Sequence, residues 1–197
     1  DAQERARGIT IFSKQARFTW KDLGITLLDT PGHVDFSAEM ERTLQVLDYA
    51  VLVVSGADGV QGHTETLWKL LKRNEIPTFL FVNKMDQPGT DKEELLANIH
   101  GRLSDNCIDF SGAWDDGFYE SLAMCEEELL EQYLETGEVS GEEIPRLIRE
   151  RKLFPVYFGS ALKLEGVEAL LDALLEYTGE KSYDAEFGAK VFKISRD

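Results

Sequence analysis

The chain has 197 residues, a formal net charge of −16 and 43% hydrophobic residues. This length allows one sizeable α/β domain with a small appendage. The negative charge argues against a protein that grips nucleic acid through a basic surface of its own, because phosphate contacts need clustered lysines and arginines. No apolar run approaches the ~20 residues that span a bilayer, so we expect no membrane association. No export signal is visible, and the isolated cysteines Cys107 and Cys125 favour the cytoplasm.

The first part of the chain predicts a β-hairpin followed by a helix. Residues 9–20 are rich in β-branched and aromatic side chains, and residues 24–30 form a second such run after a short turn. The short link predicts antiparallel pairing. Apolar residues at helical spacing then predict a helix over 35–47.

Strands and helices alternate through much of the remaining sequence. Residues 50–56 and 78–83 are apolar on both faces, which is typical of strands buried between two layers of helices. Helices are predicted over 62–74, 91–103 and 166–178, and a further strand over 154–159. This alternation predicts an α/β fold, a doubly wound and mainly parallel sheet with helices on both faces.

The alternation lapses between about residues 104 and 152. Helical patterns over 114–135 and 141–152, joined by an acidic linker, predict an inserted helical subdomain there. We expect residues 1–185 to form the main domain. Residues 186–197 contain the strand-like run AKVFKI and are expected to begin a second domain.

Polar residues follow four of the predicted strands. In parallel α/β sheets, ligands bind beyond the carboxyl ends of the strands, so we expect these residues on one rim. Three of the four groups carry side chains that a nucleotide site can use. The groups are Asp29-Thr30, Ser55-Gly56, Asn83-Lys84 with Asp86, and Gly159-Ser160-Ala161.

The segment NKMD (83–86) predicts recognition of guanine. A carboxylate that accepts hydrogen bonds from N1 and the exocyclic N2 selects guanine over adenine, and Asp86 is the candidate. Asn83 is a candidate for the N7 side of the base, and the Lys84 stem for its plane. The small Ser160 and Ala161 allow backbone amides to approach O6 of the base.

The segment LLDTPGH (27–33) predicts contacts with phosphates. Asp29, at the end of a strand, is a candidate Mg²⁺ ligand, directly or through water. Thr10 is a second candidate ligand through its hydroxyl group. Gly32 lets its backbone N–H approach a terminal phosphate, and His33 is a candidate for orienting a water molecule against it.

Each of these features has an ordinary alternative. Asp29 to Gly32 can be a plain turn, His33 a surface residue at a helix start, NKMD a loop cap, and GSA a strand-to-helix turn. The joint order and spacing of the four segments favour a nucleotide site over these separate explanations.

Together the segments resemble the translational GTPases. RGITI (7–11), DTPGH (29–33), NKMD (83–86) and GSA (159–161) are similar to the switch I, switch II and two base-recognition motifs of that family. The resemblance implies a P-loop NTPase-like G domain in which Thr10 is the switch I magnesium ligand. It also implies that His33 replaces the catalytic Gln of small GTPases and that Ile9 helps to form an apolar gate. The predicted insert corresponds to an extra subdomain of elongation factor G, and residues 186–197 to the start of a β-barrel domain.

Within that family, NKMDQPG and AKVFKI are most similar to the tetracycline-resistance ribosomal protection proteins, with elongation factor G as a near neighbour. The resemblance implies a cytoplasmic GTPase that uses GTP, GDP and Mg²⁺ and acts on the ribosome, meeting rRNA and ribosomal proteins. Release of tetracycline and translocation are the two activities it suggests, and the sequence leaves both open.

One departure from the family concerns the phosphate-binding loop. No GxxxxGK[ST] segment occurs in the chain, although this loop supplies the amides and the lysine that hold the phosphates. We therefore expect the chain to be a fragment whose sheet lacks its middle strand. Alone, it is expected to bind nucleotide poorly and to hydrolyse it negligibly. The alternative is a degenerate, non-catalytic scaffold that uses the α/β fold to hold protein partners.

Overall fold

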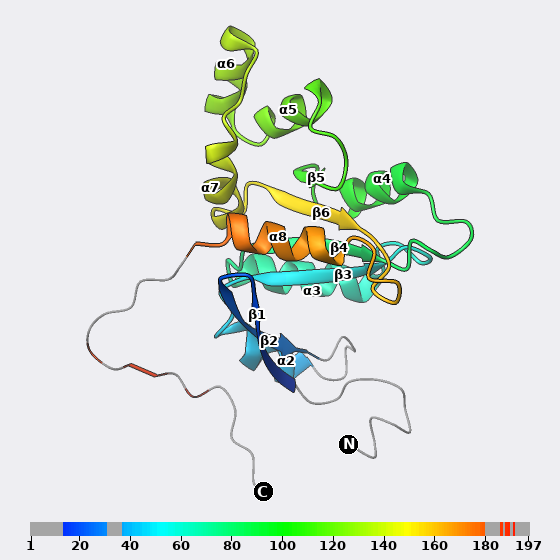
Figure 1. Cartoon of the computed structure of the whole chain (residues 1–197), viewed down its shortest axis with the longest axis vertical. Coiled ribbons are helices and arrows are strands. Elements are labelled where there is room, and N and C mark those ends of the chain that lie inside the picture. Colours follow the sequence, from blue (N-terminus) through cyan, green and yellow to red (C-terminus); the bar gives the residue numbers. More distant parts are fainter. Residues whose placement is uncertain (1–13, 31–36, 180–185, 187, 190, 192–197) are drawn as a thin grey trace, which may run out of the picture. The chain divides into compact units, whose positions relative to one another are not determined.

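The computed structural model describes residues 14–30, 37–179, 186, 188–189 and 191 (Figure 1). The chain divides into two compact units. Among the described residues, those up to Asp48 and those after Gly179 belong to one unit, and Tyr49–Gly179 form the other. In the described residues, no helix is long and apolar enough to cross a membrane.

The smaller unit contains the predicted hairpin. Strands β1 (Lys14–Trp20) and β2 (Leu23–Asp29) pair antiparallel from Lys14↔Asp29 to Trp20↔Leu23, which confirms the predicted pairing. Residues 9–13 of the predicted strand lie outside the described residues. Helix α2 (Ser37–Leu44) ends three residues before the predicted boundary. After Leu44 the α-helical hydrogen bonds are replaced by i+3 hydrogen bonds, from Val46 N to the Thr43 oxygen and from Leu47 N to the Leu44 oxygen.

The larger unit is built on a four-stranded parallel sheet. Its strands lie in the order β3 (Ala50–Ser55), β4 (Thr78–Asn83), β6 (Phe154–Phe158), β5 (Cys107–Asp109). All of the pairings in this sheet are parallel, which confirms the predicted doubly wound α/β architecture. Among the described residues, β3 is an edge strand, and the hairpin forms a separate two-stranded sheet.

Strand β4 is buried on both faces. Phe79, Leu80, Phe81 and Val82 are between 0% and 4% exposed. Phe79 and Phe81 belong to a core cluster that also contains residues of α5, α7 and α8. Leu80 and Val82 face the opposite side, because successive side chains of a strand alternate between faces. In contrast, Val51 and Val53 of the edge strand β3 are 38% and 57% exposed, so the prediction that β3 is also buried on both faces is wrong for one face.

Helices cover both faces of the sheet (Figure 1). Helix α8 (Val167–Tyr177) packs on the face that carries Phe79, through Ala173 and Tyr177. Helix α3 (Gly62–Arg73) lies on the other face, where Trp68 meets Phe154 edge-on with 4.6 Å between ring centroids. Helix α4 (Lys92–Arg102) begins with an N-cap in which Asp91 accepts the Glu94 N–H at 2.8 Å.

The region predicted as a helical insert is only partly helical. It contributes strand β5, which pairs with β6 from Cys107↔Phe154 to Asp109↔Val156. The sheet therefore continues into the range 104–152, which the sequence analysis treated as an interruption. The rest of the region forms α5 (Asp116–Ala123), α6 (Glu127–Thr136), a 3₁₀ turn η2 (Gly141–Glu143) and α7 (Ile144–Arg149).

The predicted helix over 114–135 is two helices. The break falls at Met124–Glu126, where Glu126 takes an extended conformation with φ −152° and ψ 139°. The Glu126 carboxylate accepts hydrogen bonds from Arg146 and Lys152, each at 2.5 Å. These contacts join the start of α6 to α7 and to the residues before β6. A domain boundary near residue 185 stays a prediction, because most of residues 180–197 lie outside the described residues.

Candidate nucleotide-binding site

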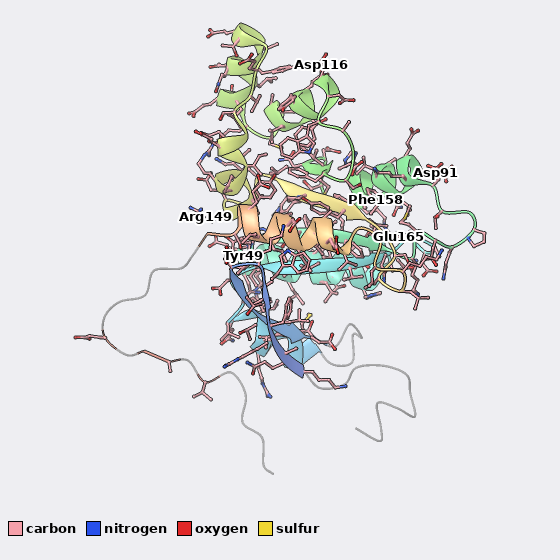
Figure 2. The ribbon with its side chains drawn as sticks, viewed as in Figure 1. Tyr49, Asp91, Asp116, Arg149, Phe158 and Glu165 are labelled. Atoms are coloured by element: carbon pink, nitrogen blue, oxygen red, sulfur yellow. The ribbon has the colours of Figure 1, made fainter. Side chains whose placement is uncertain are left out.

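Three parallel strands of the larger unit end at one edge of the sheet. Ser55 pairs with Asn83 at the ends of β3 and β4, and the end of β6, marked by Phe158, lies next to β4 (Figure 2). Backbone hydrogen bonds continue past the strands. Gly56 N donates to the Asn83 oxygen at 2.7 Å, and Met85 N donates to the Gly159 oxygen at 3.0 Å. The loops that follow the strands are therefore fixed to one another.

The loop after β4 is held in a tight turn. Lys84 adopts a left-handed conformation with φ 66°, and its N–H donates to its neighbour Asn83 Oδ1 at 2.8 Å. The Thr90 hydroxyl donates to the backbone oxygens of Met85 and Gln87, both at 3.0 Å. A non-glycine residue with positive φ is uncommon and concentrates at functional sites. The turn therefore fixes the backbone positions from which the side chains of NKMD (83–86) extend.

The loop after β6 depends on two glycines. Ser160 and Glu165 exchange two backbone hydrogen bonds of 3.0 Å, which fold the loop back on itself. A Cβ atom at Gly159 would lie 2.1 Å from the Glu165 oxygen. A Cβ atom at Gly166, which has φ 75°, would lie 2.5 Å from the Phe158 oxygen. The close backbone approach therefore requires glycine at both positions.

Asn83 connects the two loops. Its Oδ1 accepts the backbone N–H of Ala161 at 2.8 Å, and the same oxygen accepts the N–H of Lys84. The base-recognition loops, which we define as residues 83–90 and 159–166, therefore share one side chain. The rest of the sheet positions that side chain, because Asn83 is the last residue of the buried strand β4.

Asp86 is held as an ionised acceptor. The hydroxyl of the buried Ser160 donates to its carboxylate, which lowers the pKa of Asp86, and the Lys163 ammonium adds to this effect. The Lys163 nitrogen lies 3.7 Å from Asp86 Oδ2. The Ser160 hydroxyl thus contacts Asp86, which the small size of Ser160 does not predict.

The chemistry of the base-recognition loops fits a guanine ring. The Asp86 carboxylate is an acceptor for adjacent donors such as N1–H and N2–H, and the Ala161 N–H is a donor for an oxygen such as O6. Adenine presents the opposite pattern on that edge. A site whose own polar groups stay unpaired with the wrong ligand rejects it strongly. Lys163 and Thr90 belong to these loops but lie outside the four motifs, and for this reason the sequence analysis missed them.

Only part of the predicted site falls within the larger unit. Asp29 is the last residue of β2 and belongs to the smaller unit. The described residues contain no group of three or more His, Cys, Asp or Glu side chains arranged to hold a metal ion. Thr10, Gly32 and His33, together with Ile9, lie outside the described residues. The residues that come together are Asn83, Lys84, Asp86, Ser160 and Ala161.

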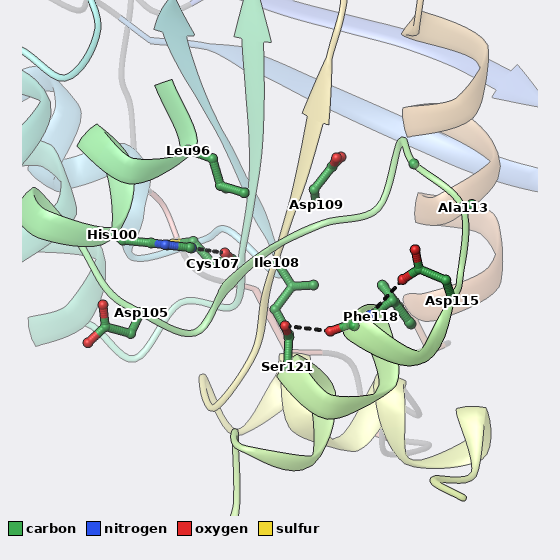
Figure 3. A pocket seen from close by; sticks show the side chains of 12 residues that line it. Leu96, His100, Asp105, Cys107, Ile108, Asp109, Ala113, Asp115, Phe118 and Ser121 are labelled. Atoms are coloured by element: carbon green, nitrogen blue, oxygen red, sulfur yellow. Dashed lines mark hydrogen bonds between the residues drawn. The ribbon is translucent and has the colours of Figure 1, made fainter. Parts of the chain in front are cut away.

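A separate pocket of about 330 Å³ lies between α4, β5 and α5 (Figure 3). Leu96, Ile108 and Phe118 supply apolar lining, and His100 Nε2 donates a hydrogen bond of 2.7 Å to the Cys107 backbone oxygen. None of the predicted site residues lines this pocket. It is therefore distinct from the base-recognition loops.

The chain is similar in sequence to GTP-binding proteins. Residues 1–180 match the family model described as the elongation factor Tu GTP binding domain. The chain is 36% identical over 217 aligned positions to the tetracycline resistance protein TetP of Clostridium perfringens, covering 98% of this chain and 33% of TetP. The chain thus spans about a third of the length of this curated relative.

A solved structure of a protein from Thermus thermophilus has the same fold. It superposes with a TM-score of 0.79 at 24% identity, covering 91% of this chain and 34% of that chain. The family match extends over both base-recognition loops and nearly the whole sequence. The chain belongs to the family of the elongation factor Tu GTP-binding domain.

Proposed function

We propose that the protein carrying this chain is a translation factor that binds GTP and GDP and hydrolyses GTP on the ribosome. The observation that carries the proposal is the Asp86 carboxylate, oriented by Ser160 beside a loop tied by Asn83. This arrangement supplies the hydrogen-bonding pattern that guanine requires. The similarity to TetP supports ribosomal protection against tetracycline as the activity, with an elongation factor G-type role as the alternative.

In this proposal the residues of the two loops have different tasks. Asp86 selects guanine, Ala161 donates to O6, Asn83 orients the Ala161 loop and faces the N7 side, and the Lys84 stem lies along the base. Ser160 holds Asp86 in place. These groups act on the base alone, so they determine which nucleotide is bound. The hydrolytic step is carried out by the residues proposed to contact the phosphates.

The phosphate side of the site is proposed from sequence. Thr10 and Asp29 would hold Mg²⁺, whose role when bound is to neutralise charge on the phosphates. Oxygen ligands of this kind, an aspartate and a threonine hydroxyl, fit a hard cation. Gly32 would donate its N–H to the terminal phosphate, and His33 would orient the attacking water. Because the proposed partner is the ribosome, with its rRNA and proteins, the proposal includes a cytoplasmic location.

The first test is displacement of a fluorescent GDP by GDP, GTP and ATP. It is carried out on this chain and on a chain extended upstream of Asp1. Tight binding that GTP displaces and ATP does not, in the extended chain, is the expected result, and ribosome-stimulated GTPase activity is then measured. Absence of binding in both chains, with both folded by circular dichroism, would favour a scaffold without nucleotide. Tight binding by this chain alone would show that the phosphate-binding loop is dispensable.

A further inference from the structure

The hydroxyl group of Ser55 is buried and has no hydrogen-bond partner. Among the buried side-chain nitrogen and oxygen atoms of the residues that the structure describes, it is the only one in this state. Native proteins pair nearly all of their buried polar groups, because an unpaired one loses its bonds to water without replacement. An unpaired hydroxyl at the edge of a binding site therefore suggests that it gains a partner in another state of that site.

Ser55 is the immediate neighbour of Asn83. The two residues are paired in the parallel register of β3 and β4, so their side chains leave the same face of the sheet. The strands stay close beyond this pair, since Gly56 N donates to the Asn83 oxygen at 2.7 Å. A Cβ atom at Gly56 would lie 3.0 Å from that oxygen. The Ser55 hydroxyl is thus placed beside the side chain that ties the base-recognition loops.

Asn83 Oδ1 holds two donors in the described structure, the N–H groups of Lys84 and Ala161, each at 2.8 Å. The Ala161 N–H is also the group that the proposed function assigns to guanine O6. One N–H cannot point well at both acceptors, because hydrogen bonds weaken steeply as they depart from linearity. Binding of guanine therefore takes one of the two donors away from Asn83.

We propose that Ser55 is a positioning residue of the guanine site, whose hydroxyl donates to Asn83 Oδ1 when guanine O6 takes the Ala161 N–H. This inference rests on the proposed function. The exchange keeps two donors on Asn83 in both states. It also gives the buried hydroxyl a partner only in the nucleotide-bound state, so its burial favours binding. Ser55 acts through Asn83 and touches no part of the nucleotide.

The test is the variant Ser55→Ala in the full-length protein that carries this chain. Without nucleotide, the variant is expected to melt at the wild-type temperature or above it, because it removes an unpaired polar group. Its affinity for GDP is expected to fall roughly 2- to 10-fold, the effect of one neutral hydrogen bond. Ser55→Thr keeps the hydroxyl and is expected to bind GDP as the wild type does.

A matched control is Thr78→Val, which removes another hydroxyl from the same sheet. Thr78 is buried in β4, and its Oγ1 donates to the Ile76 oxygen at 2.8 Å and accepts from Arg151 at 2.9 Å. This variant is expected to lose stability and to keep its relative affinity for GDP. Ser55→Ala is thus expected to lower the affinity for GDP without lowering stability. Thr78→Val is expected to lower stability without lowering the affinity for GDP.

Two results overturn the inference while the proposed function stands. One is a Ser55→Ala variant with wild-type affinity for GDP. The other is a Ser55→Ala variant that loses stability without nucleotide as Thr78→Val does, since its hydroxyl would then be paired in the empty protein. A wild-type protein that binds no guanine nucleotide overturns the proposed function, and the inference with it.

Discussion

The Oδ1 atom of Asn83 accepts the backbone N–H of Ala161 at 2.8 Å, although the two residues are 78 positions apart in sequence. This hydrogen bond joins the loop that carries Asp86 to the loop that carries Ser160. Ser160 in turn donates to Asp86, Met85 N donates to the Gly159 oxygen, and Lys163 lies 3.7 Å from Asp86, so the two loops are connected at several points. The geometry of the candidate site therefore depends on these connections.

The first prediction concerns Asn83→Ala, which removes an acceptor for two N–H groups. We expect a loss of about 1 to 2 kcal/mol in the free energy of unfolding, from two hydrogen bonds, together with weaker guanine selectivity. Urea unfolding and GDP displacement measure the two effects. The control is Asn98→Ala, because Asn98 Oδ1 accepts the Val60 N–H at 2.8 Å away from these loops. If both variants lost selectivity equally, the special role of Asn83 would be excluded.

The second prediction concerns Asp86→Asn. An amide replaces one acceptor oxygen with a donor, so guanine loses a charge-assisted hydrogen bond while xanthine, which carries an oxygen at C2, gains one. Affinity for GDP is expected to fall roughly 10- to 100-fold, and that for XDP to rise. Competition binding measures both. Asp91→Asn, which changes the N-cap of α4 in the adjoining segment, should leave the ratio unchanged.

The third prediction compares a glycine that has no room for a side chain with a glycine that has open space beside it. Gly159→Ala brings a Cβ to 2.1 Å from the Glu165 oxygen, so the loop must shift, at a cost of about 1 to 3 kcal/mol. Gly101→Ala, inside α4, places its Cβ in open space and is expected to stabilise the protein by about 0.5 to 1 kcal/mol. Thermal unfolding compares them. Equal shifts of the same sign would contradict the described loop geometry.

The fourth prediction concerns stability at acid pH. Hydrogen bonds from Arg146 and Lys152 lower the pKa of Glu126 to about 2 from its ordinary value of 4.5. Its stabilising contribution is therefore complete above pH 4.5 and is lost as the pH falls through that value towards 2. Urea midpoints between pH 6 and pH 2.5 should fall less steeply for Glu126→Gln than for the wild type. Glu127→Gln, an exposed neighbour in α6, serves as the control and should keep the wild-type slope.

The sequence predicted the sheet better than it predicted the region between β4 and β6. The parallel strands β3, β4 and β6 were recognisable because each is apolar on both faces. Strand β5 was not, because three residues are too few to show a periodicity, and only pairing with Phe154 to Val156 makes them a strand. The acidic run at 126–128 suits a continuous helix locally. The break there reflects distant partners, Arg146 and Lys152, which no local pattern reveals.

For the candidate site, the sequence proposed Asp86 and Asn83 as groups that bind a base, and it did not reveal the residues that contact them. Asp86 and Asn83 stand out by residue type and spacing. The roles of Ser160 and Lys163 depend on how two loops approach in space. The role of Thr90 depends on how its own loop folds back on itself. The phosphate side stays a prediction, because Thr10, Gly32 and His33 lie outside the described residues and Asp29 belongs to the smaller unit.

The separation between Asn83 and Ala161 also bears on the order of folding. A contact that closes a loop of 78 residues costs more chain entropy than the local turns around it, so it forms after nearer contacts have shortened the loop. During synthesis, Asp86 leaves the ribosome long before Ala161 does. We therefore expect the contact between the two loops of the candidate site to form late, after α4 and the helices α5 to α7 have folded. Pulse-labelled hydrogen exchange should find the Ala161 amide protected later than those of α4, and simultaneous protection would contradict this order.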